Sequence, residues 1–86
     1  MTQNTDFNFA TPEAIEAVLG EQLRMLRLSK NISQSVLAEE AGVSRRTITS
    51  LENGEGTTFD TLIRVMRALG VADRLRTLLP DPAVRP

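Results

Sequence analysis

Residues 33–54 read SQSVLAEEAGVSRRTITSLENG and carry the clearest structural pattern of the 86-residue chain. Two serines in this segment occupy positions typical of the residue that precedes a helix, and the apolar spacing after them predicts short helices over 34–41 and 45–52. Gly42 separates the two helices, because the left-handed backbone conformation that commonly follows a helix favours glycine. The connection spans only about three residues, so the two helix axes must cross steeply.

Each of these helices has an apolar side that can pack inward and a polar side that remains exposed. The small residue Ala38 lies where the helices would touch, and apolar residues on both sides of the turn would anchor them: Val36, Leu37, Val43, Ile48 and Leu51. The polar side chains of the second helix that are left on the outer side are Arg45, Arg46, Thr49 and Ser50. This pattern is typical of a helix-turn-helix, whose second helix enters the major groove of double-stranded DNA.

The residue types on that outer side suit contact with DNA bases. Arginine can form two hydrogen bonds with guanine, and the methyl group of threonine can contact the methyl group of thymine. Arg45 and Arg46 could also be an ordinary solvated helix start, but positive charge at a helix N-terminus is unfavourable in the free protein. A polyanionic partner therefore explains the arginine pair better. Gln34 and the free N–H groups at the start of its helix are placed to bind a phosphate.

Further helices are expected on both sides of this segment. Thr11-Pro12 predicts the start of a helix that reaches about Lys30, and Gly20 within it favours a joint between two helical pieces. Helical spacing of apolar residues then predicts a helix over 59–69 and a last helix over about 72–79.

The expected organisation is one domain between two terminal segments. Residues 1–10 form an arm, for which the alternatives are a short strand around Phe7 and Phe9 or a disordered tail. The folded domain covers 11–79. Prolines make 80–86 an extended, non-helical tail.

The repeated apolar residues of the helices form the expected core: Leu19, Leu23, Leu26, Leu37, Ile48, Leu51, Leu62 and Leu69. Phe59 is interpreted as a core ring rather than as a stacking platform for single strands. We expect Glu52 to form an ion pair inside the domain, with Arg24 or Arg27 as its partner. Arg24, Arg27 and Lys30 have two interpretations, since they could contact phosphates or be favourable cations near the C-terminus of their helix.

The composition argues against catalysis. The chain contains no cysteine and no histidine, so it lacks disulfides and the commonest general base and metal ligand. The serines have no histidine to activate them, and the adjacent carboxylates Glu39 and Glu40 would point in different directions on a helix. We therefore expect no enzyme activity, no metal site and no cofactor.

Hydropathy and charge indicate whether the protein could contact a membrane or bind DNA. No apolar run approaches the roughly 18 residues that cross a bilayer, and the N-terminus does not resemble a secretory signal, so we expect a cytoplasmic protein without membrane contact. The net charge of −1 argues against DNA binding. However, the positive side chains gather between residues 24 and 46, and the local field matters more than the sum.

The chain resembles the Xre family, the lambda-repressor and Cro-like DNA-binding proteins. The resemblance covers about residues 19–79 and rests on Leu19-Gly20, Leu23 to Leu26, Ser33-Gln34, Leu37-Ala38, Ala41 to Ser44, Ile48, Leu51 to Gly54, and Leu62 with Ala68 to Val71. It implies a compact five-helix, all-α domain. It also implies base contacts from Arg45, Arg46, Thr49 and Ser50, and phosphate contacts from Gln34, Ser44, Thr47 and Asn53.

Two features depart from the family pattern. Many relatives carry a positive residue after the Glu-Asn-Gly sequence, whereas this chain has Glu55, so the loop that follows should contribute less to phosphate binding. The segment before Gly20 is also longer than the minimal domain requires, and dimerisation or a partner could explain it.

The resulting hypothesis is a repressor that binds a palindromic DNA operator as a homodimer, with the last helix and the tail as the dimer surface. An alternative comes from the tail Leu78-Leu79-Pro80-Asp81-Pro82, which resembles that of HipB-type antitoxins. Such proteins repress their own operon and also bind a kinase-like toxin. The alternative function is therefore that of an antitoxin with a toxin protein as its partner.

Overall fold

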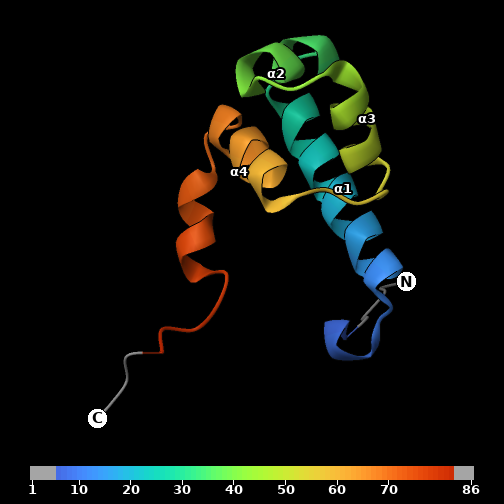
Figure 1. Ribbon diagram of the computed structural model, residues 1–86, viewed down its shortest axis with the longest axis vertical. Coiled ribbons are helices and arrows are strands. Elements are labelled where there is room, and N and C mark those ends of the chain that lie inside the picture. Colours follow the sequence, from blue (N-terminus) through green and yellow to red (C-terminus); the bar gives the residue numbers. More distant parts are fainter. Residues whose placement is uncertain (1–5, 83–86) are drawn as a thin grey trace.

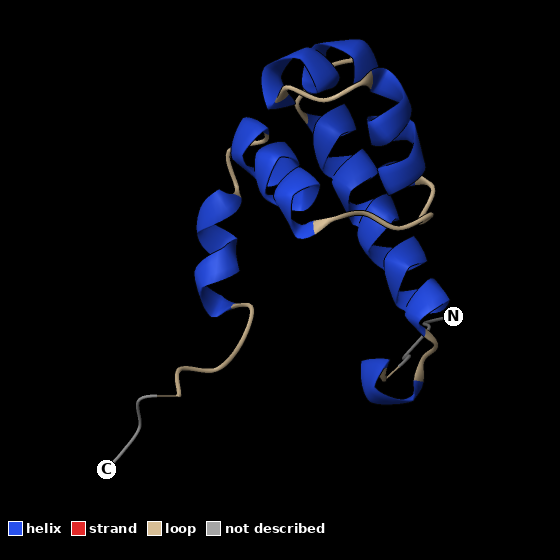
Figure 2. Cartoon of the chain, in the orientation of Figure 1, coloured by secondary structure: helices blue, strands red, loops and turns tan. Residues whose placement is uncertain are grey.

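The computed structural model describes residues 6–82, and every regular element in that range is helical (Figures 1 and 2). The elements, in chain order, are η1 (Phe7–Phe9), α1 (Pro12–Ser29), α2 (Gln34–Ala41), α3 (Arg45–Glu52), α4 (Phe59–Ala68) and η2 (Ala72–Thr77). The expected all-α fold of five helices is confirmed by α1 to α4 together with η2. The last of these is a 3₁₀ helix that ends at Thr77, earlier than expected.

The starts of the four α-helices follow directly from the sequence. Each helix is preceded by a serine or threonine whose hydroxyl accepts a hydrogen bond from the backbone N–H three residues later, at 3.0 or 3.1 Å: Thr11, Ser33, Ser44 and Thr58. Each hydroxyl satisfies one of the N–H groups that a helix start leaves without an internal partner. These caps explain why the starts of α2 and α3 agree with the sequence prediction.

The turn between α2 and α3 depends on Gly42. Its φ of 73° lies in the left-handed region, as predicted for the residue that ends the helix. The N–H of Val43 donates to the carbonyl oxygen of Ala38 at 3.0 Å, which is the bond that defines a Schellman helix end. The backbone thereby reverses within two residues, and α3 packs against both α2 and α1.

Helix α1 is continuous, so the predicted joint at Gly20 is wrong. Gly20 is instead required by packing, because a Cβ atom there would lie 2.5 Å from the carbonyl oxygen of Leu51 and 2.7 Å from that of Glu52. The missing side chain lets α1 approach the end of α3 closely. Figure 1 shows α1 running along α3 and projecting beyond it towards the N-terminus.

The core lies where α1 to α4 meet. Its buried members are Leu37, Ala38, Ala41, Ile48, Leu51, Val65 and Leu69. Four of the eight predicted core residues are among them, and Leu23 and Leu26 pack against this cluster while partly exposed. Leu62 is also partly exposed. The sequence prediction of the core is therefore largely confirmed for α2 and α3.

The prediction was wrong at three apolar positions. Phe59 is 71% exposed, and Leu19 and Val36 are 44% and 40% exposed in the single chain. Phe59 is exposed because the buried side of α4 is formed by Val65 and, one turn later, by Leu69, the residue that directly follows the helix. At about 100° per residue, Phe59 lies about 120° around the helix from Val65 and faces away from the core.

Near the N-terminus, Phe7–Phe9 forms a turn of 3₁₀ helix rather than the short strand or the disordered tail considered from the sequence. The Asp6 side chain accepts a hydrogen bond from the N–H of Asn8 at 2.9 Å and so starts this turn. The other parts of the predicted arm and tail, residues 1–5 and 83–86, lie outside the described residues.

Candidate nucleic-acid interface

Helix α3 presents the residues that the sequence predicts to contact bases. Arg45 and Arg46 are exposed in its first turn, and Thr49 and Ser50 are partly exposed one turn later. Neither arginine forms an ion pair with any residue between 6 and 82, and the first turn of α3 contains no acidic residue. The positive charge at this helix start is therefore not neutralised within the described chain.

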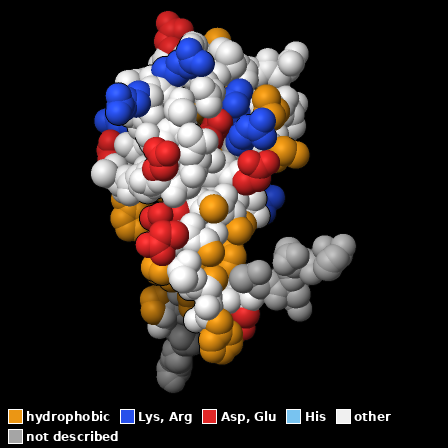
Figure 3. All heavy atoms as spheres, turned by 90° about the vertical axis from the view of Figure 1, so that its right-hand side faces the viewer, with side chains coloured by type: hydrophobic (Ala, Val, Ile, Leu, Met, Phe, Trp, Pro, Cys, Tyr) orange, Lys and Arg blue, Asp and Glu red, His pale blue; other side chains and the backbone are white. Residues whose placement is uncertain are grey.

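The surface on the α3 side differs along its length. Figure 3 views the molecule from this side, and lysine and arginine side chains gather over its upper part, with acidic side chains interspersed. Hydrophobic side chains dominate the lower part, at the level of the projecting half of α1. The positive groups are thus concentrated at the end of the molecule that holds α2 and α3 (Figure 1).

A buried ion pair connects the last residue of α3, Glu52, to Arg27 of α1. The Arg27 guanidinium donates through Nε to Oε2 of Glu52 at 2.7 Å and through Nη2 to Oε1 at 3.0 Å. Its Nη1 donates to the carbonyl oxygen of Ile32 at 2.9 Å. The hydrogen bonds to Glu52 raise the pKa of Arg27, against the opposing effect of burial.

This geometry decides between the predicted partners of Glu52. Arg27 is the partner, whereas Arg24 is exposed and lies 3.5 Å from Glu21 on the same helix. Because both charged side chains of the Arg27–Glu52 pair are almost fully buried, a phosphate contact by Arg27 is excluded in this fold. The role of Arg27 is structural: it fixes the end of α3 against α1.

Gln34, a predicted phosphate contact at the start of α2, connects this pair to the exposed side of α3. Its Nε2 donates to Oε1 of Glu52 at 3.0 Å. Its Oε1 accepts from Oγ1 of Thr49 at 3.2 Å and from Nε of Arg45 at 3.5 Å. Gln34 therefore lies beside two of the four predicted base-contacting residues and is partly buried.

The other predicted phosphate contacts lie at the two ends of α3. Ser44 caps the helix, and its Oγ lies 2.9 Å from Oγ1 of Thr47. Asn53 is exposed at the opposite end, where its N–H donates to the carbonyl oxygen of Thr49 at 3.0 Å. An eight-residue helix is about 12 Å long. The predicted contacts thus occupy both ends of α3 and the adjacent start of α2.

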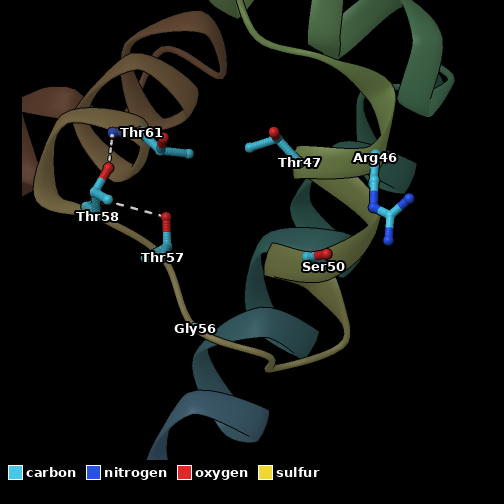
Figure 4. Close-up of a pocket in the computed structure, with 7 residues that line it drawn as sticks. All are labelled: Arg46, Thr47, Ser50, Gly56, Thr57, Thr58 and Thr61. Carbon is cyan, nitrogen blue, oxygen red and sulfur yellow. Dashed lines mark hydrogen bonds between the residues drawn. The ribbon is translucent and has the colours of Figure 1, made fainter.

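A polar hollow of about 320 Å³ separates α3 from the start of α4 (Figure 4). Its lining residues are Arg46, Thr47, Ser50, Gly56, Thr57, Thr58 and Thr61. Thr47 points across the hollow towards Thr61, whereas the guanidinium of Arg46 extends away from α4 (Figure 4). The hollow adds three threonines that the sequence prediction did not connect with α3, because no pattern along the chain shows that α4 starts opposite it.

Residues 6–82 hold neither a membrane-spanning helix nor a cluster of metal ligands. No helix between residues 6 and 82 is long and apolar enough to cross a membrane. Within the same range, no three His, Cys, Asp or Glu residues form a group that could hold a metal ion.

The sequence matches known proteins over this same region. The family model described as helix-turn-helix matches residues 23–74. A protein of Methanoregula boonei is 35% identical over 78 residues, which are 87% of this chain and 25% of that protein. A protein of Methanocella arvoryzae is 46% identical over 50 residues, or 58% of this chain and 15% of that protein.

A protein of Pyrococcus furiosus is 39% identical over 67 residues, which are 78% of this chain and 18% of that protein. All three are assigned as HTH-type transcriptional regulatory proteins. This chain spans a quarter or less of the length of each. Since the family model covers more than half of the chain and the fold has the arrangement described above, the chain belongs to the helix-turn-helix family of Cro/C1 type, the Xre family of DNA-binding transcription regulators.

Proposed function

We propose that this chain reads specific sequences in double-stranded DNA and acts as a transcriptional repressor, as a homodimer on a palindromic operator. The observation that carries the proposal is the exposed, unneutralised arginine pair Arg45–Arg46 at the start of α3. Cations at this position destabilise a free helix, and contact with a polyanion reverses that effect. Such a role requires a compartment that contains DNA, in keeping with the cytoplasmic location expected from the sequence.

In this proposal, the side chains on α3 and beside it have two different roles. The bases are contacted from the major groove by Arg45, Arg46, Thr49 and Ser50. The sugar-phosphate backbone is contacted by Gln34, Ser44, Thr47 and Asn53, which position the helix without reading sequence. All four phosphate-contacting side chains are neutral, so the positive charge that attracts DNA should come mainly from Arg45 and Arg46.

The proposed dimer surface is an apolar groove between α1, α4 and η2. It has a volume of about 460 Å³ and is lined mainly by Leu19, Leu23, Leu26, Leu62, Met66, Val71, Leu75 and Leu78. Leu78, at the end of this groove, is 57% exposed, and the following residue, Leu79, is 74% exposed. Contiguous exposed apolar surface of this kind is typical of an interface. Two copies joined here would have to place their α3 helices about 34 Å apart, one turn of DNA.

The DNA-binding proposal is tested with two double variants that remove the same charge. Arg45→Ala with Arg46→Ala should weaken binding to a duplex selected from random sequences by at least about 30-fold. One good arginine–guanine contact is worth about 1–3 kcal/mol, so the loss of two such contacts costs at least about 2 kcal/mol. Arg64→Ala with Arg67→Ala removes two arginines of α4 that line neither the polar hollow nor the apolar groove and should leave the affinity within about threefold. Equal affinity of the two double variants would remove α3 as the reading helix.

The dimer proposal has a separate test. Leu78→Ser with Leu79→Ser should shift the protein from dimer to monomer in sedimentation equilibrium, and the monomer should bind a single half-site more weakly than the dimer binds the full palindrome. A wild-type chain that is monomeric both free and on its selected DNA would contradict the homodimer.

The antitoxin is a second candidate function, favoured by the exposure of the tail. Leu79 is 74% exposed and is not part of the core. A toxin-binding role predicts that a protein encoded beside this chain co-purifies with it and is lost when residues 80–86 are removed. Loss of the partner with unchanged DNA affinity would assign the tail to the toxin, whereas retention of the partner would exclude the tail.

A further inference from the structure

The described part of the N-terminal arm, residues 6–10, carries two aromatic rings that its own chain does not bury. Phe9 is 87% exposed, more than any other large apolar side chain between residues 6 and 82, and Phe7 is 43% exposed. The arm still has a defined shape, because the Asp6 carboxylate accepts from the N–H of Asn8 and the Asp6 carbonyl oxygen accepts from the N–H of Phe9, both at 2.9 Å. The rings are therefore presented to solvent on a folded turn, and burying them against a partner would be favourable.

The apolar groove between α1, α4 and η2 offers a surface that suits these rings. Its volume of about 460 Å³ lies in the range of pockets that enclose a ligand. Arg74 is the only charged residue among those that line it. Arg74 forms no ion pair with a residue between 6 and 82, since the neighbouring Asp73 pairs with Arg76 at 2.7 Å. The groove thus combines apolar walls with one unneutralised positive charge.

The charge of the arm is opposite to that of the groove. Asp6 is the only charged residue in 6–10, and the projecting half of α1 that follows carries Glu13 and Glu16. The first positive side chain of the sequence is that of Arg24. A contact between an arm and a groove therefore brings opposite charges together, whereas arm against arm or groove against groove would bring like charges together. Charge complementarity favours the first arrangement.

The position of the arm favours the groove of a second chain. Ala10 and Thr11 are extended, so the arm leaves α1 at the tip of its projecting half (Figure 1). Leu19, the groove residue closest to the arm in sequence, follows Thr11 by eight residues, or about 12 Å along the helix. To fill its own groove the arm would have to fold back along α1, whereas the arm of a second copy can enter from outside.

The area of such a contact is compatible with a specific dimer. A fully buried phenylalanine removes about 150–250 Å² of surface from water. With the exposed shares of Phe7 and Phe9, an equal area of groove, and two such contacts in a symmetric pair, the buried area is about 1,000 Å². This area reaches the lower size of specific interfaces, about 1,000–1,200 Å².

We propose that the arm of each chain docks in the apolar groove of a second copy, with Phe7 and Phe9 against the leucines of the groove and Asp6 facing Arg74. The exchange is reciprocal, so the two contacts are equivalent, as in a twofold symmetric dimer. This inference rests on the proposed homodimer and assigns the segment of the second chain that fills its groove. It also gives the projecting half of α1 a role, since that half carries the arm away from its own domain.

Disulfide cross-linking tests which chain fills the groove, because the chain contains no cysteine. Phe9→Cys is mixed with Met66→Cys, whose side chain lines the groove, and one of the two carries a tag that gives mixed dimers their own mass. The matched control replaces Met66→Cys by Arg64→Cys, which at 100° per residue lies on the opposite side of α4 and outside the groove. A disulfide requires Cα atoms within about 7 Å, so we expect mixed dimers with Met66→Cys and few with Arg64→Cys.

Two cross-linking results would overturn the proposal. Equal yields with Met66→Cys and Arg64→Cys would show that the arm does not select the groove. A double variant, Phe9→Cys with Met66→Cys, that closes an internal disulfide as a monomer, without mixed dimers in the first experiment, would show that the arm fills its own groove. A wild-type chain that is monomeric in sedimentation equilibrium would refute the proposed homodimer together with this contact, whereas a dimer without the cross-link would refute only the contact. Neither measurement includes DNA, so the outcome does not depend on the DNA-reading proposal.

A variant that keeps an aromatic ring gives an independent measurement. The chain has no tryptophan or tyrosine, so Phe9→Trp introduces a single fluorescent reporter. As the protein concentration rises through the range in which sedimentation shows dimer formation, we expect its emission to move to shorter wavelength and its quenching by acrylamide to fall. Emission in the dimer that stays that of an exposed indole would overturn the proposal.

Arg74→Glu tests the charge match. It should weaken dimerisation at least about twofold, because each dimer contains two such contacts. Arg67→Glu makes the same change in net charge at an exposed arginine of α4 outside the groove and should leave dimerisation unchanged. Equal effects of the two variants would show that only net charge matters and would contradict the contact between Asp6 and Arg74.

Discussion

Replacing Arg27 by leucine measures how much of the fold depends on the buried ion pair. The guanidinium donates three hydrogen bonds, two to Glu52 and one to the carbonyl oxygen of Ile32. In Arg27→Leu the carboxylate of Glu52 stays buried with only the hydrogen bond from Gln34. Removing one partner of a buried pair costs about 3–5 kcal/mol, because the other charge remains without compensation.

This cost is large for a domain of this size. Small domains have a free energy of unfolding of about 5–15 kcal/mol, and each kcal/mol corresponds to about 4–8 °C in Tm. We therefore expect the Tm of Arg27→Leu to fall by at least about 12 °C, measured by circular dichroism at 222 nm and checked by urea unfolding. The matched control is Arg24→Leu, on the same helix, whose side chain is 47% exposed and pairs with Glu21 at 3.5 Å. Its effect should stay within about 0.5 kcal/mol.

The same variant pair carries a pH prediction. The pKa of Arg27 is raised in the folded state, mainly by its hydrogen bond to Glu52. A raised pKa means that the protonated form is stabilised by folding, so the contribution is complete below the pKa of an unfolded arginine and is lost only in strong alkali. The Tm difference between wild type and Arg27→Leu should therefore be constant from about pH 6 to about pH 9.

Two results would refute this account of the ion pair. Equal Tm values for Arg27→Leu and Arg24→Leu would show that burial of the pair has no energetic consequence. A further loss of stability in the double variant Arg27→Leu with Glu52→Leu, relative to Arg27→Leu alone, would also contradict it. An uncompensated charge predicts instead that removing Glu52 restores part of the stability.

Three further substitutions test the packing. Gly20→Ala should lower the free energy of unfolding by about 1–3 kcal/mol, because its Cβ would meet the Leu51 carbonyl oxygen at 2.5 Å; a rise in Tm, as for alanine in an unhindered helix, would contradict the close approach. Gly42→Ala should cost about 1–2 kcal/mol in urea unfolding, since its φ of 73° is unfavourable for a residue with a side chain, and an unchanged midpoint would argue against this turn. Phe59→Ala should change Tm by less than Val65→Ala, although it removes more atoms, because Phe59 is 71% exposed and Val65 is 1% exposed; the reverse order would restore Phe59 to the core.

The success of the sequence prediction differs between local and long-range features. Caps and turns were predictable because a hydroxyl at Ser33 or Ser44 and a left-handed glycine at Gly42 act within a few residues of the chain. The pairing of Glu52 was predicted only as a choice between two arginines of α1. Arg24 and Arg27 are three residues apart, and only the packing of α1 against α3 determines which of them is buried.

The predictions that failed share one physical cause: each depends on how segments that are distant in the sequence pack against one another. Gly20 was interpreted from its helix propensity, which describes an isolated helix and contains no information about the carbonyl groups of α3. Phe59 was placed in the core because it is apolar and follows the helical period. Periodicity does not determine which of two apolar sides of α4 faces the protein, and Val65 and Leu69 occupy that side. The position of Gln34 beside Thr49 likewise depends on the crossing of two helices.

The net charge of −1 is a weak guide to nucleic-acid binding because charges in this fold are not equivalent. In the described residues, four arginines are engaged with acidic partners, on α1, α4 and η2 and in the buried pair: Arg24, Arg27, Arg64 and Arg76. Arg45 and Arg46 have no such partner within that range. The potential that a phosphate meets depends on these unneutralised charges at short range, since others are screened beyond about 10 Å in ordinary salt. An acidic chain can therefore present a positive helix end to DNA, provided that its acids are paired or lie elsewhere.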